Sequence, residues 1–79
     1  MKIYNYNGSK NICGARVKEA RKKLGISQEA LAARLQVEGV NIERDSVSRI
    51  EIGTRFVADY EIAVLCMVLG VSAEYLLEM

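Results

Sequence analysis

Apolar residues recur at helical spacing in the first third of the chain. Between Asn11 and Leu24 they lie at intervals of four, three and four positions, so one helical face carries them and most Lys and Arg residues lie opposite. These apolar residues are Cys13, Val17, Ala20 and Leu24. Gly25 follows, where a left-handed residue commonly ends a helix. The pattern predicts a first helix over residues 11–24.

The middle of the chain predicts two short helices joined by a longer connection. Ser27 is suited to cap a helix over residues 28–35 through its hydroxyl group. A second helix over residues 45–52 ends at Gly53. The inward-pointing residues of these two helices are Leu31, Ala32, Leu35, Val47 and Ile50. The second helix therefore has an apolar back and polar residues on its outer side.

The last third of the chain predicts two further helices. Asp59 is suited to cap the first of them, which Gly70 closes, and Ser72 is suited to cap a short final helix. The apolar residues of these helices are Ile62, Leu65, Cys66, Leu69, Leu76 and Leu77. Because the chain has no proline and its glycines stand singly, helices joined by short turns are favoured over a β-rich design. We therefore expect an all-α fold of five helices.

The first ten residues differ from the rest of the chain. Apolar and polar residues alternate there for a few positions, and the alternation stops at Gly8-Ser9. This pattern is typical of a loose arm or a short edge strand. The expected organisation is an N-terminal arm over residues 1–10 and one domain over residues 11–79.

Size and cysteine content bound the class of protein. A chain of 79 residues, 51% of them hydrophobic, forms a single small core. Its longest apolar run, residues 62–69, is far shorter than the roughly 20 residues that span a bilayer, so a soluble, unprocessed chain is expected. Cys13 and Cys66 form no CxxC pair and lie on apolar faces, which favours buried, reduced thiols and a cytoplasmic location.

The charges are distributed unevenly, although their sum is only +1. Residues 10–24 contain six Lys and Arg residues against a single Glu, whereas residues 56–79 contain four acidic residues and no Lys or Arg. A basic run of this kind is typical of a nucleic-acid binder and equally of a solvated helix face. A second signal is needed to decide between them.

That signal comes from the two central helices. A short helix followed by a second one with an apolar back and hydrogen-bonding residues outside fits the helix-turn-helix logic, in which the second helix enters the major groove. The stretches LGISQEALAARL, SVSRIEIGTR and LGVSAEYLL resemble the Cro/CI-type (XRE) helix-turn-helix family of phage and bacterial transcription regulators, over about residues 12–77. The resemblance implies a five-helix, lambda-repressor-like DNA-binding domain.

The resemblance also assigns roles to particular residues. It implies base contacts at Arg44, Asp45 and Arg49, and a buried structural salt bridge between Arg21 and Glu51. The residues that it assigns to contacts with the DNA backbone are Gln28, Ser46, Ser48, Arg55, Lys10 and Arg16. Since Arg can bind the O6 and N7 atoms of guanine and Asp can accept from the N4 amine of cytosine, a half-site containing G·C pairs is our hypothesis.

Two features depart from the usual family pattern. The connection QVEGVNIE is about five residues longer than is typical, a feature shared by a subset of relatives that also resemble the stretch RFVADYE at residues 55–61. Glu43 stands where relatives often carry a Ser or Thr cap. Either Glu43 caps the following helix, or Asp45 does, which would remove Asp45 from the base-reading set.

A second surface is expected on the helix that begins near residue 59. Beyond its core stripe this helix carries Val64, Met67 and Val68, and Val71, Tyr75 and Met79 extend the apolar area. The area could form a two-fold dimer interface that presents recognition helices to half-sites about 34 Å apart. Alternatively, Ile3, Tyr4 and Tyr6 of the arm fold over the area, or the first and last helices bury it.

The most direct functional interpretation is a DNA-binding transcriptional regulator, of the phage or mobile-element repressor type, that binds a palindromic operator as a homodimer. The alternative is a protein–protein interaction module, such as an antitoxin or anti-repressor, that has kept the fold. An enzyme is not expected, because the chain has no histidine, no serine or cysteine with an evident base partner, and no glycine-rich phosphate loop. No metal, cofactor or small-molecule ligand is expected either.

Overall fold

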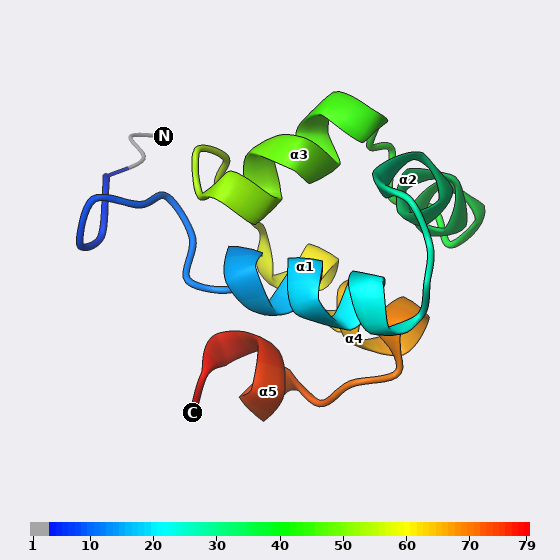
Figure 1. The fold of residues 1–79 in the computed structure, drawn as a ribbon. Coiled ribbons are helices and arrows are strands. Elements are labelled where there is room, and N and C mark those ends of the chain that lie inside the picture. Colours follow the sequence, from blue (N-terminus) through cyan, green and yellow to red (C-terminus); the bar gives the residue numbers. More distant parts are fainter. Residues whose placement is uncertain (1–3) are drawn as a thin grey trace.

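The computed structural model describes residues 4–79, which form an all-α fold (Figure 1). Its helices are α1 (Gly14–Lys23), α2 (Gln28–Val37), α3 (Arg44–Ile52), α4 (Asp59–Leu69) and α5 (Ala73–Leu77). The helix α1 lies at the centre and contacts α3, α4 and α5, while α2 packs against α3 and α4. Figure 1 shows α3 and α5 on opposite sides of α1, so one side of α3 is left uncovered. Among the helices described, none has the length and apolarity to cross a membrane.

The core draws on every helix and on the connection between α2 and α3. Its fully buried side chains include Val17, Leu31, Ile50, Leu65 and Leu76. The sequence pattern places Leu24 on the apolar face of the first helix, but Leu24 is 46% exposed, because α1 ends at Lys23 and the chain turns at Gly25, whose φ is +70°.

The connection between α2 and α3 is ordered and contributes to the core. It spans residues 38–43, because α2 continues two residues beyond its predicted end. Val40 and Ile42 are buried, and the Gln36 side chain donates a hydrogen bond to the Ile42 carbonyl at 2.6 Å. The sequence pattern predicts only a connection here, so the contribution of this segment to the core is a finding of the structure.

Helix capping follows the sequence in two places and departs from it in two others. The hydroxyl groups of Ser27 and Ser72 accept backbone N–H groups three residues on, at 3.0 Å each, which confirms both predicted caps. The predicted Asp59 cap was wrong, because Ala58 occupies that position and the Glu61 carboxylate accepts its backbone N–H at 2.9 Å. At α3 the cap residue is Glu43, which makes no side-chain cap hydrogen bond, and Asp45 lies inside the helix.

The described part of the arm contains a tight turn. Tyr6 and Ser9 exchange backbone hydrogen bonds of 2.6 and 3.0 Å, and the two residues between them, Asn7 and Gly8, both have positive φ angles. An Asn-Gly pair with this geometry is typical of a two-residue hairpin turn, a signal that was present in the sequence. Tyr4 and Tyr6 are exposed, so these two side chains do not cover the apolar surface of α4. Ile3 lies outside the described residues.

Candidate nucleic-acid interface

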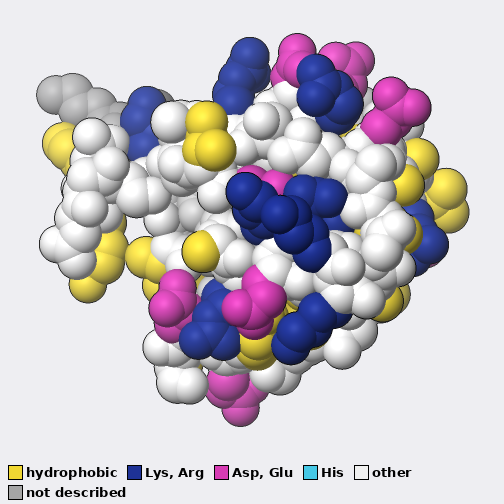
Figure 2. Space-filling model, viewed as in Figure 1, with side chains coloured by type: hydrophobic (Ala, Val, Ile, Leu, Met, Phe, Trp, Pro, Cys, Tyr) yellow, Lys and Arg dark blue, Asp and Glu magenta, His cyan; other side chains and the backbone are white. Residues whose placement is uncertain are grey.

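The helix α3 has two chemically distinct faces. Val47, Ile50 and Glu51 are buried against the rest of the molecule. Most of the opposite side is exposed and carries Arg44, Asp45, Arg49 and Ile52, with Ser46 and Ser48 half-buried at its edges. In Figure 2 acidic and basic side chains stand together along the upper edge of the molecule, over α3, and further basic side chains gather between α1 and α3. The outer face is therefore charged and open to a partner.

The inner face is fastened by a buried ion pair. The Arg21 guanidinium donates to Glu51 through Nε at 2.7 Å and through a terminal nitrogen at 3.0 Å, and it also donates to the Ile26 carbonyl at 2.9 Å. Their side chains are only 10% and 1% exposed. Hydrogen bonding to Glu51 raises the pKa of Arg21. This geometry joins α1 to α3.

The start of α2 is tied to the same ion pair. The Gln28 side chain donates to Glu51 at 3.0 Å, so part of its amide group is engaged inside the molecule. A hollow of about 550 Å³ joins Gln28 to Arg44, with Arg21, Ser27 and Glu29 as its other lining residues. The N-terminal ends of α2 and α3 therefore meet at one concave surface. Helix N-termini favour anions through their free N–H groups and the helix dipole.

The charged side chains on the outer face of α3 are exposed and only weakly paired. Arg44 and Asp45 form an ion pair at 3.3 Å, with side chains 57% and 69% exposed. Within residues 4–79 Arg49 takes part in no ion pair. An exposed pair of this kind contributes about 0–1 kcal/mol to stability, so its members are free to exchange partners at little cost.

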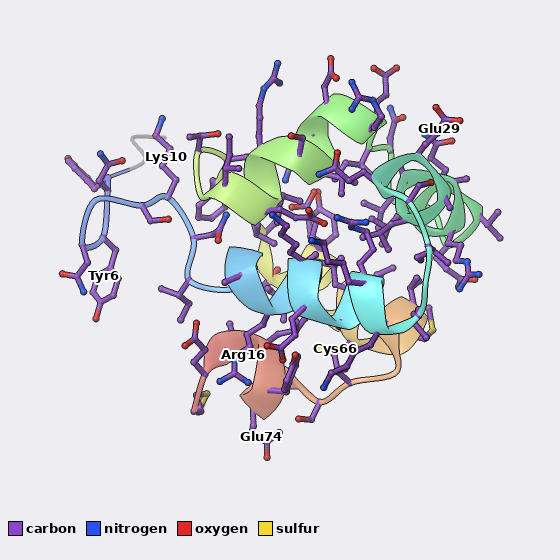
Figure 3. The ribbon with its side chains drawn as sticks, viewed as in Figure 1. Tyr6, Lys10, Arg16, Glu29, Cys66 and Glu74 are labelled. Atoms are coloured by element: carbon purple, nitrogen blue, oxygen red, sulfur yellow. The ribbon has the colours of Figure 1, made fainter. Side chains whose placement is uncertain are left out.

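The remaining predicted backbone contacts occupy different environments. Lys10 is exposed beside the loop after α3, where its backbone N–H donates to the Gly53 carbonyl at 2.8 Å (Figure 3). Arg55 is engaged by Glu61 at 2.9 and 3.1 Å, and this hydrogen bonding raises its pKa. Arg16 extends from the α5 side of α1, with its guanidinium 4.7 Å from the ring centroid of Tyr75. The structure thus does not bring Arg16 to the outer face of α3.

The C-terminal end of α3 has an anchor that sequence reasoning missed. The Asn11 side-chain amide donates to the carbonyls of Ile50 and Arg55 at 3.1 and 2.8 Å, and its oxygen accepts the Gly14 N–H at 2.9 Å. The Ser9 hydroxyl adds a hydrogen bond to the Gly53 carbonyl at 3.1 Å. Asn and Ser ahead of an apolar run are common helix-start signals, but nothing local indicates that they bind a distant helix.

The apolar surface of α4 is only partly open. Met67 is 58% exposed, while Val64, Val68, Val71 and Tyr75 are half-buried. The Tyr75 hydroxyl donates to Glu19 on α1, so α1 and α5 cover part of the area that was expected to form a dimer interface. The hydrogen bond raises the pKa of Tyr75 and lowers that of Glu19.

The two cysteines lie at the start of α1 and within α4. Both cysteines are free thiols, as the sequence predicted. Cys13 is buried as expected, whereas Cys66 is only half-buried. Burial raises the pKa of Cys13 to about 11 and also raises that of Cys66. Neither group is therefore poised for nucleophilic chemistry.

Comparison with known proteins adds one result. The family model described as a helix-turn-helix domain matches residues 13–78, which is most of the chain. No curated protein and no solved structure matches the sequence. In the structure the matched region begins at the residue before α1 and includes all of α5.

Proposed function

Since the chain belongs to the helix-turn-helix domain family of XRE-like, DNA-binding regulators, we propose that it represses transcription by occupying a palindromic operator as a dimer. Proteins of this family are typically not enzymes. Repression by occupancy needs only binding, because a protein on the operator blocks access to it. We propose a repressor of the phage or mobile-element type, which acts by occupying its operator.

The observation that carries the proposal is the exposed face of α3. An Arg can make two hydrogen bonds to guanine, and an Asp can accept one from the cytosine amine, so Arg44, Asp45 and Arg49 supply the chemistry that reads G·C pairs. Their exposure leaves these groups available without unfolding any part of the core. The buried Glu51 on the opposite side keeps the helix in place while its outer face binds.

Contacts with DNA phosphates are proposed for the groups that flank this face. Gln28 lies at the start of α2, and Ser46 and Ser48 lie at the edges of the α3 face. Lys10 adds a positive charge beside the loop after α3. Arg55 contributes only if it exchanges Glu61 for a phosphate. Such contacts fix the orientation of the protein on the duplex without reading its sequence.

Selection of bound sites from a random double-stranded DNA library at near-physiological salt tests the proposal. The wild-type protein should enrich a palindromic motif that contains G·C pairs. The Arg49→Ala variant should lose preference at one base position, at a cost of about 1–3 kcal/mol. Arg34→Ala is the matched control, because Arg34 is an exposed arginine that belongs to α2 and to none of the proposed DNA contacts. An unchanged motif in Arg49→Ala would exclude base reading by Arg49.

The dimer is proposed to form through the α4 surface around Met67, together with Val64, Val68, Val71 and Tyr75. Two copies would then place two recognition helices on successive half-sites. A dimer also offsets the modest net charge, which limits the affinity of one copy for DNA. In sedimentation the Met67→Glu variant should have half the mass of the wild type. Val37→Glu is the control, since Val37 is an exposed apolar residue on α2.

The alternative function, a protein–protein interaction module, is favoured by one observation. Met67 exposes more than half of its side chain on the longest helix, where a partner protein could bind instead of a second copy. A monomeric protein that enriches no DNA motif would support this alternative. A palindromic motif bound by a dimer would exclude it as the main activity.

A further inference from the structure

Ile52 is an apolar residue on the face of α3 that is otherwise charged. Its side chain is 69% exposed, although a β-branched aliphatic residue of this size is usually buried. The inner side of α3 already packs through Val47 and Ile50, which are both 1% exposed. Ile52 is therefore not a core residue of this fold.

The position of Ile52 continues the reading face. Asp45, Arg49 and Ile52 follow one another at intervals of four and three residues, so the three side chains stand in one row along the helix. All three are exposed, and their directions differ most from those of the buried Val47 and Ile50. Ile52 is thus continuous with the surface that the proposed function assigns to the bases.

The three side chains differ in chemistry in a way that matches base edges. A carboxylate accepts hydrogen bonds, a guanidinium donates them, and an isoleucine offers only an apolar surface. In the major groove the one apolar group of the unmodified bases is the C5-methyl group of thymine. Water is displaced favourably when two such apolar groups meet.

We propose that Ile52 is a specificity-determining residue that packs against a thymine methyl group in the operator. The inference rests on the proposed function, since it requires α3 to lie in the major groove. Three residues advance a helix by about 4.5 Å, and successive bases on a strand are about 3.4 Å apart. The thymine therefore lies about one base step from the position that depends on Arg49.

Uracil substitution tests the contact one methyl group at a time. The thymines of the selected operator are replaced by uracil one at a time, which removes one methyl group and keeps every hydrogen-bonding atom of the base. Each half-site should contain one position at which this single replacement weakens binding of the wild type about fourfold, the effect of exposing one buried methyl group. For Ile52→Ala the same substitution should have no effect, and for Ile52→Val a smaller one.

The control variant is Val37→Ala, which shortens another exposed β-branched residue at the end of α2. It should show the wild-type response to uracil. Because Ile52 is exposed, Ile52→Ala should unfold at the same temperature as the wild type, and circular dichroism checks this.

The outcomes separate this inference from the proposed function. If the wild type enriches a motif but uracil affects the wild type and Ile52→Ala equally at every position, the methyl contact is excluded and DNA reading stands. A motif without thymine next to the Arg49-dependent position also excludes the contact. If the wild type enriches no motif, the proposed function fails, and the contact fails with it.

Discussion

The two faces of α3 carry the same kind of ion pair in opposite environments. On the inner face Arg21 and Glu51 meet with side chains 10% and 1% exposed, and Gln28 adds a further hydrogen bond. On the outer face Arg44 and Asp45 meet with more than half of each side chain in water. Burial makes the inner pair costly to break, whereas the outer pair can open at little cost. One helix thus holds a fixed side and an available side.

The difference explains how a small domain can hold a short helix in place and still leave one side of it exposed. A helix of nine residues is too short to be stable alone in water, so tertiary contacts must hold it. The buried pair, two apolar residues and the hydrogen bonds from Ser9 and Asn11 supply those contacts. The outer side chains therefore contribute little to folding.

Removing Glu51 should have the largest effect on stability. The Glu51→Ala variant leaves the Arg21 guanidinium buried without its carboxylate, which should lower the free energy of unfolding by about 3–5 kcal/mol. Urea denaturation measures the change. The double variant Arg21→Met, Glu51→Leu is the control, because an apolar pair of similar volume should recover most of the loss. A loss below about 1 kcal/mol in Glu51→Ala would show that the pair does not hold α3.

Adding a side chain at Gly14 should have the next largest effect on stability. A Cβ atom there would lie 2.2 Å from the carbonyl oxygen of Ile50, so α1 and α3 would have to separate. Although alanine favours helices, Gly14→Ala should lower the free energy of unfolding by about 1–3 kcal/mol. Thermal unfolding provides the measurement.

The matched control for Gly14 is Gly39→Ala. At Gly39 a Cβ atom meets nothing within 4 Å, and only the φ angle of +90° opposes the substitution. Its cost should be about 1 kcal/mol, from backbone strain alone. A stabilised Gly14→Ala variant would contradict the close approach of α1 to α3.

The Arg55–Glu61 ion pair should make the stability of the fold depend on pH. Burial raises the pKa of Glu61, but hydrogen bonds from Arg55 and from the Ala58 backbone outweigh it, so the pKa lies below its ordinary value of 4.5. As the pH falls, Glu61 is therefore protonated in the unfolded chain at a higher pH than in the folded protein. Glu61 should stabilise the fold fully above pH 4.5, and this stabilisation should be lost as the pH falls through the lower folded pKa.

Melting temperatures between pH 6 and pH 3 measure this effect. The decline should be shallower for Glu61→Gln than for the wild type, because the variant has no carboxyl group to protonate at this site. Glu38→Gln is the control, since Glu38 is exposed and takes part in no ion pair within residues 4–79. An identical decline in the wild type and Glu61→Gln would contradict the lowered pKa.

Neutralising the outer pair should change stability least. The Asp45→Asn variant loses an exposed ion pair, so its free energy of unfolding should differ from that of the wild type by less than about 1 kcal/mol. If Asp45 reads cytosine, the same variant should alter the selected DNA motif at one position. A loss of stability close to that of Glu51→Ala would overturn the distinction between the two faces.

The sequence predicted the helices and several of their ends because those signals are local. Apolar spacing located the inward residues of α2 and α3, and Ser27 and Ser72 cap their helices as expected. The glycines after α1, α3 and α4 have positive φ angles, which their positions indicated. The outward direction of Arg49 followed from the same periodicity.

The remaining features depend on contacts between distant segments. Asn11 binds residues 39 and 44 positions away, and no local pattern indicates such partners. Val40 and Ile42 enter the core from a segment without helical spacing. Ala58 takes the cap position of α4, where its own backbone N–H donates to the Glu61 carboxylate, a different hydrogen bond from the side-chain cap that was expected of Asp59.

The hydrogen bonds from Ser9, Lys10 and Asn11 determine where the N-terminal boundary of a stable fragment should lie. The family match begins at residue 13, yet Ser9, Lys10 and Asn11, which donate hydrogen bonds to the carbonyls of Ile50, Gly53 and Arg55, all precede it. A fragment trimmed to the family boundary would lose these hydrogen bonds at the C-terminal end of α3. For transplantation into a chimeric regulator, the transferable unit starts at Ser9.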